Sequence, residues 1–367
     1  MVKALLFGSN GFLGSHLQSK LEGEVIGVNI RQQNWKGNIP DDANVFINCI
    51  GKAHDHKGTA TEHDFYFANY ELVKVLFEEF LKSSAQLFIH ISSIAAVEEN
   101  ERTEVLTENS VGNPQSHYGK SKKAAEEYLL KQTLPSGKKL FVLRPSMIHG
   151  EGDKGNLELL YKFISKGIPY PLSAFQNSRS FLSIDNFIFF LKEIINNQDK
   201  LDSGIYHIAD DEVLSTKEIL EIIKRVENKK IIDLYIPPIV IKVLAKIGDF
   251  SPFPLNTKRL KKMTSNLEVS NQKIKSVLDI SLMVGIEISV RGFPSSRRAV
   301  SPIWISYPVN SHPVSPEKIP STASSFPAVW QRCFSFCNTV RTGSSSMPRI
   351  RPPSSTLSGS AISQPNI

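Results

Sequence analysis

The stretch KALLFGSNGFLGSHLQSKL, residues 3–21, decides the fold. It opens with the apolar run KALLFG, which is typical of a strand buried on both faces of a parallel sheet. Glycines at positions 8, 11 and 14 follow directly, and a helix is predicted from the second glycine onward. The stretch therefore predicts a strand, a tight glycine turn and a helix whose free backbone N–H groups face that turn.

A turn of this kind fits a pyrophosphate, because glycine lets the backbone approach the phosphates and a helix N-terminus favours negative charge. The spacing is GxxGxxG, one residue wider in its first gap than the common GxGxxG. The alternative is a glycine-rich turn that binds nothing. We expect a dinucleotide to contact Gly8, Asn10, Gly11, Phe12, Leu13 and Gly14.

Apolar runs and amphipathic segments alternate through the first half of the chain. Strands separated by helices of this length form a parallel sheet covered on both faces. The predicted fold class is therefore α/β, a doubly wound parallel (Rossmann) sheet with a smaller mixed substrate-binding lobe. Strands are predicted at residues 3–8, 24–30, 44–50, 86–92 and 139–145, and helices at 11–21, within 63–84 and at 116–130.

The second half is more mixed, with helices predicted at 156–167, 183–197 and 215–226 and a strand at 204–210. We expect a dinucleotide-binding core at 1–145 and a substrate-binding lobe, interleaved with the last sheet elements, at 146–280. Residues 281–367 are rich in Ser, Pro and Arg and have no sustained period, so we predict disorder there. That tail is either a basic interaction segment or the product of a shifted reading frame.

The charge distribution argues against a nucleic-acid partner. The net charge is +7, but the residues before Ser281 contain 35 basic and 34 acidic side chains, so the basicity belongs to the tail. Three cysteines make neither a disulfide framework nor a zinc pattern. The N-terminus does not resemble a signal peptide, and no apolar stretch is long enough to span a bilayer. We expect a cytoplasmic protein without membrane insertion, and a homodimer on symmetry grounds.

A phenol and an ammonium lie one helical turn apart in SHYGKSKKAAEEYLL, residues 116–130. Residues i and i+4 share a helix face, so Tyr118 and Lys122 point the same way. A nearby cation stabilises phenolate, and we therefore expect Lys122 to lower the pKa of Tyr118. The pair predicts an acid/base device, although a helix can also hold such a pair by chance.

The end of the second strand bears on the choice of dinucleotide. NAD-binding chains place a carboxylate there on the ribose hydroxyl. This chain has GVNIRQ instead, with Asn29 and then Arg31. No carboxylate is present here to repel a 2′-phosphate, and Arg31 could bind one. The sequence therefore favours NADP(H), with NAD as the alternative. The simpler interpretation is that Arg31 is an exposed arginine without a ligand.

Four motifs occur in order: GSNGFLG, HISSIAAV, YGKSK and LRPSMIHGEGDKGN. Together they resemble the extended short-chain dehydrogenase/reductases, the NAD-dependent epimerase/dehydratase family, over residues 1–280. Within that family the chain is similar to bacterial enzymes that act at C4 of UDP-linked sugars. The strand end VNIRQQNW resembles 4-ketoreductases that reduce a UDP-4-keto-6-deoxy-hexosamine for capsule or O-antigen synthesis.

The resemblance implies roles for individual residues. Tyr118 would carry the proton of the C4 oxygen, Lys122 would hold the nicotinamide ribose, and Ser93 would polarise the C4 carbonyl, with Ser92 as the competing serine. Asn69 would lie behind the cofactor. The implied substrate contacts are Asn156, Arg179 and Arg259, and no metal site is expected.

The chain departs from the family pattern in three places. VEE at 97–99 replaces the common VYG, and His149 stands where a tyrosine is common. The Ser/Pro-rich tail replaces a final amphipathic helix, which would expose apolar surface on the smaller lobe.

Three functions remain open at this point. The first is the NADPH-dependent 4-ketoreductase. The alternative is a UDP-glucose or UDP-N-acetylglucosamine 4-epimerase that keeps its NAD bound. The distant alternative is a Rossmann protein that senses a dinucleotide without catalysis, which would have no need of Ser93, Tyr118 and Lys122 together. An altered C-terminus could also leave an unstable or inactive product.

Overall fold

A computed structural model of the protein describes residues 3–53, 59–153, 161, 174–227, 236–250, 256–280 and 282. All of them belong to the first of two compact units, residues 1–305 and 306–367. The helix predicted at 156–167, apart from Tyr161, and the predicted tail after residue 282 lie outside the described residues, as does Asn156. The side chain of Arg259 is likewise outside what the structure describes.

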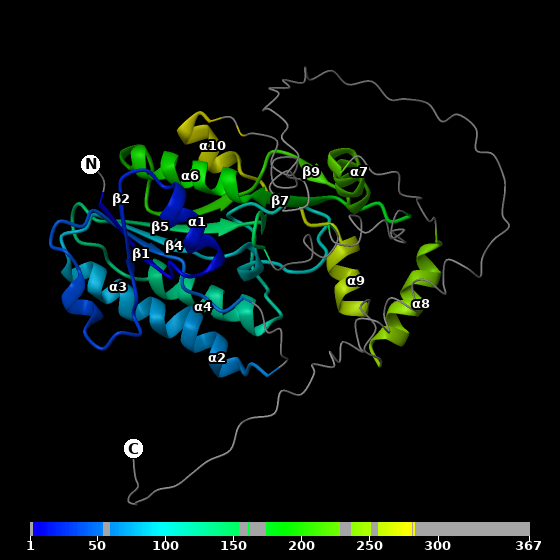
Figure 1. The fold of residues 1–367 in the computed structure, drawn as a ribbon, viewed down its shortest axis with the longest axis horizontal. Helices are drawn as coiled ribbons and strands as arrows, with labels where there is room; N and C mark the ends of the chain where they lie inside the picture. The colour runs from blue at the N-terminus through cyan, green and yellow to red at the C-terminus, as the bar shows by residue number, and fades with distance from the viewer. Residues whose placement is uncertain are drawn as a thin grey trace, which may run out of the picture. The chain divides into compact units, whose positions relative to one another are not determined.

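The main sheet has six parallel strands in the order β2-β1-β3-β4-β5-β8 (Figure 1). Every strand predicted for the core is present in it, and the strand predicted at 204–210 extends its edge as β8. The bounds are β1 Lys3–Phe7, β2 Glu24–Val28, β3 Val45–Asn48, β4 Leu87–Ile91, β5 Lys139–Pro145 and β8 Gly204–Ile208.

Two apolar layers cover the sheet, because alternate side chains of each strand point to opposite faces. Leu6 and its equivalents pack with α1, α6 and α10, whereas Phe7 and its equivalents pack with α3 and α4. These helices are α1 Phe12–Lys20, α3 Leu72–Lys82, α4 His117–Leu130, α6 Ile184–Asn196 and α10 Gln272–Leu278. The doubly wound prediction is confirmed.

The order in which the strands are added to the sheet reverses between β1 and β3. From β1 the chain moves outward to β2 and then returns to β3 on the other side of β1. In doubly wound sheets the crevice at the carboxyl ends of the strands beside this switch point is the usual ligand site. The glycine turn after β1 and residues 49–52 after β3 both lie there.

A second sheet has the order β6-β7-β9, with β6–β7 parallel and β7–β9 antiparallel. This mixed sheet agrees with the prediction of a smaller mixed lobe beside the parallel sheet. Helix α7 begins with a capping box, since Ser215 Oγ accepts from Glu218 N at 3.1 Å and Glu218 Oε2 accepts from Ser215 N at 2.7 Å. The bounds are β6 Met147–His149, β7 Arg179–Ser183, β9 Val213–Leu214, α7 Thr216–Glu227, α8 Pro238–Gly248 and α9 Thr257–Thr264.

Shorter helices complete the described chain. They are η1 Trp35–Asn38, α2 Glu62–Tyr66, the π-helix η2 Phe67–Glu71, η3 Ile94–Ala96 and η4 Gln198–Lys200. Within the described ranges, no helix has the length and apolarity that crossing a membrane requires.

Candidate active site

The glycine turn has the close-approach geometry that the sequence predicts. Gly8 adopts φ +88°, which L side chains rarely tolerate, and its carbonyl accepts from Gly11 N at 3.0 Å. A Cβ at Gly14 would lie 2.2 Å from the Gly8 carbonyl oxygen, so only glycine lets α1 pack this closely on the turn. Gly11 caps α1 without a side chain, which leaves the first N–H groups of the helix available to an anion.

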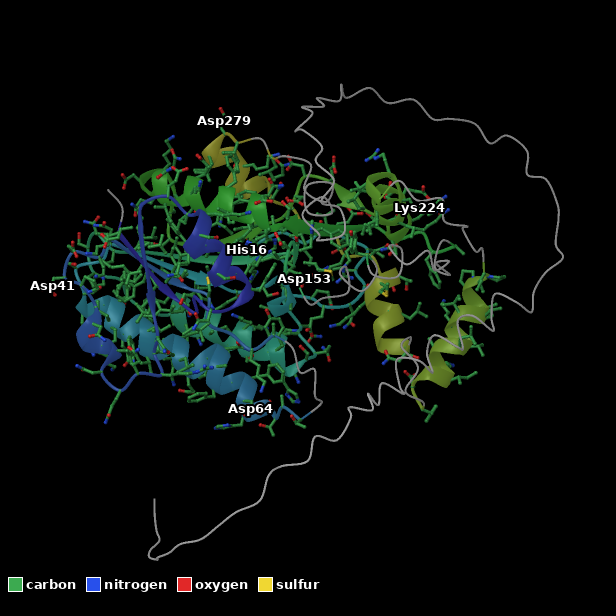
Figure 2. All side chains as sticks on the ribbon, in the orientation of Figure 1. His16, Asp41, Asp64, Asp153, Lys224 and Asp279 are labelled. Atoms are coloured by element: carbon green, nitrogen blue, oxygen red, sulfur yellow. The ribbon has the colours of Figure 1, made fainter. Side chains whose placement is uncertain are left out.

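The other predicted turn residues surround this helix end. Asn10 and Gly11 are exposed, whereas Phe12 and Leu13 are half-buried at the start of α1. His16, on the same helix, contacts the carbonyl oxygen of Glu151 through Nε2 at 2.8 Å, near the segment that carries Asp153 (Figure 2). Helix α1 is therefore tied to the chain that follows the second sheet's first strand.

Arg31 lies exposed in a turn just beyond β2. Its backbone N–H donates to Asn29 Oδ1 at 3.1 Å, so the asparagine side chain shapes the turn. In the part of the chain that the structure describes, no ion pair involves the Arg31 guanidinium. The charge is thus uncommitted at the position where a ribose phosphate contact is expected.

Asn69 joins the end of β3 to α4. It is fully buried on the π-helical turn η2, a type of irregularity that is frequent at functional sites. Its Oδ1 accepts from Lys52 N at 2.8 Å, and its Nδ2 donates to Lys52 O and to Ser121 Oγ, both at 3.0 Å. The two bonds to Lys52 hold the backbone that follows β3, and the bond to Ser121 ties it to α4.

Tyr118 lies in the first turn of α4, and its phenol is hydrogen-bonded with the Ser93 hydroxyl. Burial raises the pKa of Tyr118, the Ser93 bond lowers it, and the negative charges of Glu99 and Glu126 raise it further. The net shift is therefore opposite to the lowered pKa that the pairing with Lys122 predicts. The ammonium donates instead to the Ile91 carbonyl oxygen at 2.8 Å.

Lys122 is itself an unusual group. It is 4% exposed, and burial lowers its pKa from 10.5 to about 8. No carboxylate pairs with it among the described residues. A buried ammonium held by a neutral oxygen is costly for stability and is common at functional sites.

The structure distinguishes the two serines after β4. Ser92 is buried and donates to Glu126, which also accepts from Arg144 Nη2 at 2.6 Å. Ser93 is half-buried, caps η3 by accepting from Ala95 N at 3.2 Å, and reaches Tyr118. Only Ser93 is therefore placed to share an oxygen with the phenol.

Glu99, in the VEE segment that departs from the family pattern, has a structural role that sequence reasoning missed. Both Glu99 carboxylate oxygens accept from Ser116, one from its N–H at 2.9 Å and one from its hydroxyl at 2.5 Å. Ser116 Oγ in turn accepts from Gly119 N at 3.0 Å and caps α4. Glu99 thus fixes the helix turn that carries Tyr118. No local spacing links residues 99 and 116, so no sequence signal could have found this contact.

The second departure, His149, is a packing residue. It is fully buried against Phe181, and neither ring nitrogen has a hydrogen-bond partner in the described structure. Burial lowers its pKa to about 3 and raises the pKa of Asp210, whose Oδ2 lies 3.9 Å from His149 Nε2, to about 7. The ring is therefore neutral at ordinary pH and shows no acid/base arrangement.

The predicted substrate contacts are only partly described. Arg179, on β7, is 7% exposed and donates through Nη1 to Ser265 Oγ at 2.9 Å and Lys262 O at 3.3 Å. Burial lowers its pKa to about 10. Among the described ion pairs none involves Arg179, so the guanidinium is available to an anion.

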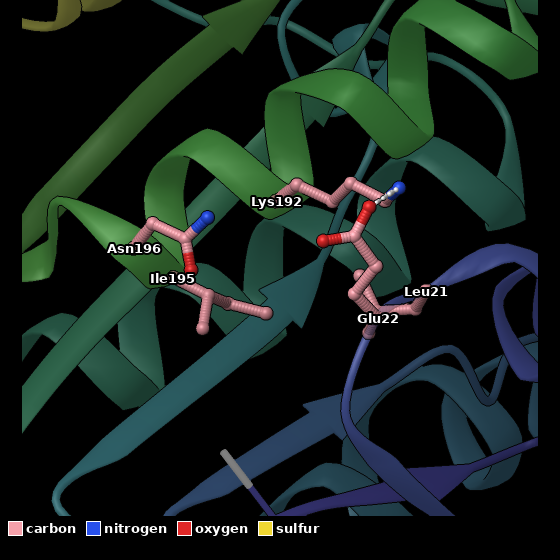
Figure 3. Close-up of a pocket in the computed structure, with 5 residues that line it drawn as sticks. All are labelled: Leu21, Glu22, Lys192, Ile195 and Asn196. Atoms are coloured by element: carbon pink, nitrogen blue, oxygen red, sulfur yellow. Dashed lines mark hydrogen bonds and ion pairs between the residues drawn. The ribbon is translucent and has the colours of Figure 1, made fainter. Parts of the chain in front are cut away.

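A further feature of the surface lies outside the crevice. A small depression between the end of α1 and α6 is lined by Leu21, Glu22, Lys192, Ile195 and Asn196, and its Glu22–Lys192 ion pair spans 2.8 Å (Figure 3). It contains none of the predicted site residues.

Within the described chain, no cluster of His, Cys, Asp or Glu could hold a metal ion.

The parallel sheet, its switch point and the glycine turn define a Rossmann-fold protein with a doubly wound sheet. A family model described as "NAD dependent epimerase/dehydratase family" matches residues 4–209, and the chain belongs to that family. The resemblance inferred from the four motifs is confirmed.

Curated relatives agree with this assignment. A UDP-glucose 4-epimerase of Vibrio cholerae is 26% identical over 301 residues, covering 75% of this chain and 89% of that protein. An N-acetyl-alpha-D-glucosaminyl-diphospho-ditrans,octacis-undecaprenol 4-epimerase of Escherichia coli O157:H7 is 25% identical, covering 74% and 88%.

Solved structures share the fold. A UDP-glucuronic acid 4-epimerase variant of Bacillus cereus, in complex with a fluorinated UDP-sugar and NAD, aligns with TM-score 0.62 at 16% identity, over 79% of this chain and 97% of that one. RMD from Pseudomonas aeruginosa, complexed with NADPH, aligns with TM-score 0.62 at 14% identity, over 80% and 99%. At these identities the likeness concerns the fold alone.

Proposed function

We propose that the protein is an NAD(P)-dependent oxidoreductase that acts at C4 of a diphosphate-linked sugar, with 4-epimerisation of a UDP-sugar as its reaction. The observation that carries this proposal is the grouping of Ser93, Tyr118 and Lys122 at the carboxyl end of β4, on the sheet edge that also carries the glycine turn. Both curated relatives are named as 4-epimerases, and their named substrates share a sugar joined to a diphosphate.

The residues of the crevice fit a nicotinamide dinucleotide. The turn at Gly8, held open by Gly14, and the uncapped end of α1 suit the pyrophosphate. Lys122 would hold the nicotinamide ribose. The bound group would supply hydride transfer, which is the cofactor's own chemistry.

The protein's own part is proton transfer and orientation. Tyr118 would donate a proton to the C4 oxygen when a ketone is reduced and accept one when an alcohol is oxidised. Ser93, bonded to the same phenol, would hold that oxygen in line. Because burial raises the pKa of Tyr118, abstraction of the alcohol proton requires the Lys122 cation to stabilise phenolate.

Arg179 would bind the diphosphate. Its guanidinium is buried, bonded only to neutral oxygens and free of a described carboxylate partner. Charge-assisted, two-pronged bonds to phosphate are what such an arginine is suited to. Asn156 and Arg259 stay predicted substrate contacts.

A second function, reduction of a UDP-4-keto-6-deoxy-hexosamine for capsule or O-antigen synthesis, keeps one supporting observation. Arg31 is uncommitted at the end of β2, where NADP(H) would need a cation. The nucleotide recovered with the purified protein separates the two. NAD that resists dialysis supports the epimerase, whereas exchangeable NADPH supports the reductase. A homodimer in the cytoplasm stays our expectation in either case.

The test is Tyr118→Phe, with Tyr128→Phe as the matched control on the same helix. Tyr128 is half-buried and contacts the Tyr70 ring, away from Ser93. We expect loss of the Tyr118 hydroxyl to slow turnover of a UDP-sugar by about 10²–10⁴-fold and the control to keep its activity. Equal activity of the two variants would refute the proposed role.

A further inference from the structure

Helix α8 exposes an unusually apolar face. Ile239 is 69% exposed, Val243 52%, Ile247 59% and Phe250, just beyond the helix, 94%. Side chains at i, i+4 and i+8 lie on one face of a helix, so these residues form a continuous strip. We name the four residues the α8 strip. A clustered strip of this size marks an interaction surface, whereas single exposed apolar residues do not.

The rest of α8 shows how the strip is oriented. Ile241, Ala245 and Gly248 are buried on the opposite side, against the protein. Lys242 and Lys246 are exposed and border the strip on the helix surface. An apolar face bordered by lysines is the pattern of helices that lie in a membrane interface.

Helix α9 adds positive charge beside the strip. It packs against α8, and Asp249 joins the two by accepting from Thr257 N at 2.9 Å and Thr257 Oγ1 at 2.6 Å. Lys261 and Lys262 of α9 are exposed. Residues 236–265 carry six basic side chains and one acidic side chain, the Asp249 already engaged with Thr257.

Charge decides among the possible occupants of the strip. A second copy would bring the same basic region against itself, since a two-fold contact pairs a surface with its own copy. The chain after residue 280 has eight basic and two acidic residues and would also be repelled. An anionic, apolar surface complements both the strip and the lysines. We infer that α8 and the lysines of α8 and α9 dock the protein on an anionic phospholipid bilayer.

The docking surface is connected to the candidate active site. The carboxyl end of α9 contacts Arg179, through Lys262 O and Ser265 just beyond the helix. On the proposed function, Arg179 binds the substrate diphosphate, so α9 contributes to the docking surface and also contacts the arginine of that site. A sugar diphosphate carried on a lipid would then be presented to Arg179 from the bilayer. This consequence rests on the proposed function, whereas docking itself does not.

The test is cosedimentation of the full chain with phospholipid vesicles. Vesicles of phosphatidylcholine alone are compared with vesicles that also contain phosphatidylglycerol, at low and high salt. We expect binding to the anionic vesicles that weakens with salt. The double variant Val243→Asp/Ile247→Asp should lose about tenfold or more in affinity. Val111→Asp is the matched control, because Val111 is 85% exposed outside α8.

Three outcomes would overturn the inference. The wild-type chain could remain in the supernatant with anionic vesicles. The double variant could bind as the wild type does, which would assign binding to the tail or to charge alone. The double variant could instead differ from the wild type in oligomeric state by analytical ultracentrifugation while neither protein binds vesicles. That result would assign the strip to contact with a second copy. None of these readouts depends on catalysis, so they leave the proposed function to its own test.

Discussion

Arg144 on β5 and Arg179 on β7 are equally buried, each 7% exposed, but their surroundings differ. Arg144 donates to both oxygens of the Glu126 carboxylate, at 3.0, 3.1 and 2.6 Å. Among the described residues, Arg179 bonds to a serine hydroxyl and a backbone carbonyl and to no carboxylate. The first arginine has its counter-charge built into the fold, whereas the second, on the proposed function, would find its counter-charge in the substrate diphosphate.

Lys122 belongs with Arg179 in this comparison. Its ammonium is buried and its described hydrogen bond goes to the Ile91 carbonyl oxygen. Both unpaired cations are residues that we propose contact the ligand, whereas the paired cation shares Glu126 with Ser92. In this protein a buried charge that has a partner of opposite charge therefore indicates a structural role, and a buried charge that has none indicates a candidate site residue.

The largest effect on stability is expected from Arg144→Met. The change leaves Glu126 buried without a counter-charge, which costs about 3–5 kcal/mol of unfolding free energy. Chemical denaturation measures it. The paired change Glu126→Leu with Arg144→Met should recover much of the loss, because no charge then stays buried. A single variant as stable as the wild type would contradict the structural role of this pair.

Lys122→Met should separate stability from activity. We expect turnover to fall by about 10²–10⁴-fold, because the phenolate of Tyr118 loses its cation. At neutral pH the variant should nevertheless be about 1–2 kcal/mol more stable, since a buried charge without a carboxylate partner is removed. A variant that is both inactive and unfolded would contradict this reading.

The pH dependence of that difference has a defined sign. The pKa of Lys122 is about 8 in the folded chain and 10.5 when unperturbed, so the unfolded state holds the proton more tightly. Wild-type unfolding free energy should therefore rise between about pH 8 and 10.5 relative to Lys122→Met. Paired denaturation series across that window measure it, and a constant difference would contradict the unpaired ammonium.

Arg179→Met should weaken binding more than it changes stability. Loss of charge-assisted bonds to a diphosphate costs about 1.5–3 kcal/mol, roughly ten- to a hundredfold in the affinity for UDP. Calorimetric titration of UDP measures it. Arg102→Met is the matched control, because the Arg102 guanidinium pairs with Glu104 and, among the described bonds, shares no partner with the Arg179 guanidinium. Unchanged UDP affinity would mean that Arg179 is not the anion site.

Glu99→Gln should give the smallest effect. The amide keeps an acceptor for Ser116 but loses the charge, so we expect a loss of about 0.5–1 kcal/mol in stability. The pKa of Tyr118 should fall, because the negative charge of Glu99 raises it. The pH–rate profile of turnover would then shift to lower pH. Glu98→Gln is the control, and identical profiles for both variants would contradict a positioning role for Glu99.

Sequence reasoning succeeded where the pattern is local. The six strands, α1, α4 and the glycine turn all depend on spacings within about 20 residues, and GSNGFLG and YGKSK mark them directly. Tyr118 and Lys122 share a helix face because they are four residues apart. The resemblance favours Ser93 over Ser92, but the reason why Ser92 is engaged elsewhere comes from the structure, because Ser92 donates to Glu126 on α4.

The features that were missed depend on contacts between distant residues. Glu99 reaches Ser116, and Arg179 reaches Ser265, across separations that no periodicity encodes. The raised pKa of Tyr118 comes from burial and from two carboxylates, which the i, i+4 argument does not include. Strand β7 and helices α8 to α10 were not predicted, because their apolar residues pack against partners far along the chain.

The proposed reaction is tested most directly with a UDP-sugar that carries deuterium at C4. The purified protein is incubated with UDP-glucose or UDP-N-acetylglucosamine labelled in this way, without added reductant, and the product is examined by NMR. We predict the C4 epimer with deuterium retained at C4, because the same hydride leaves and returns. Absence of the epimer, or an epimer that has lost the label, would contradict the account.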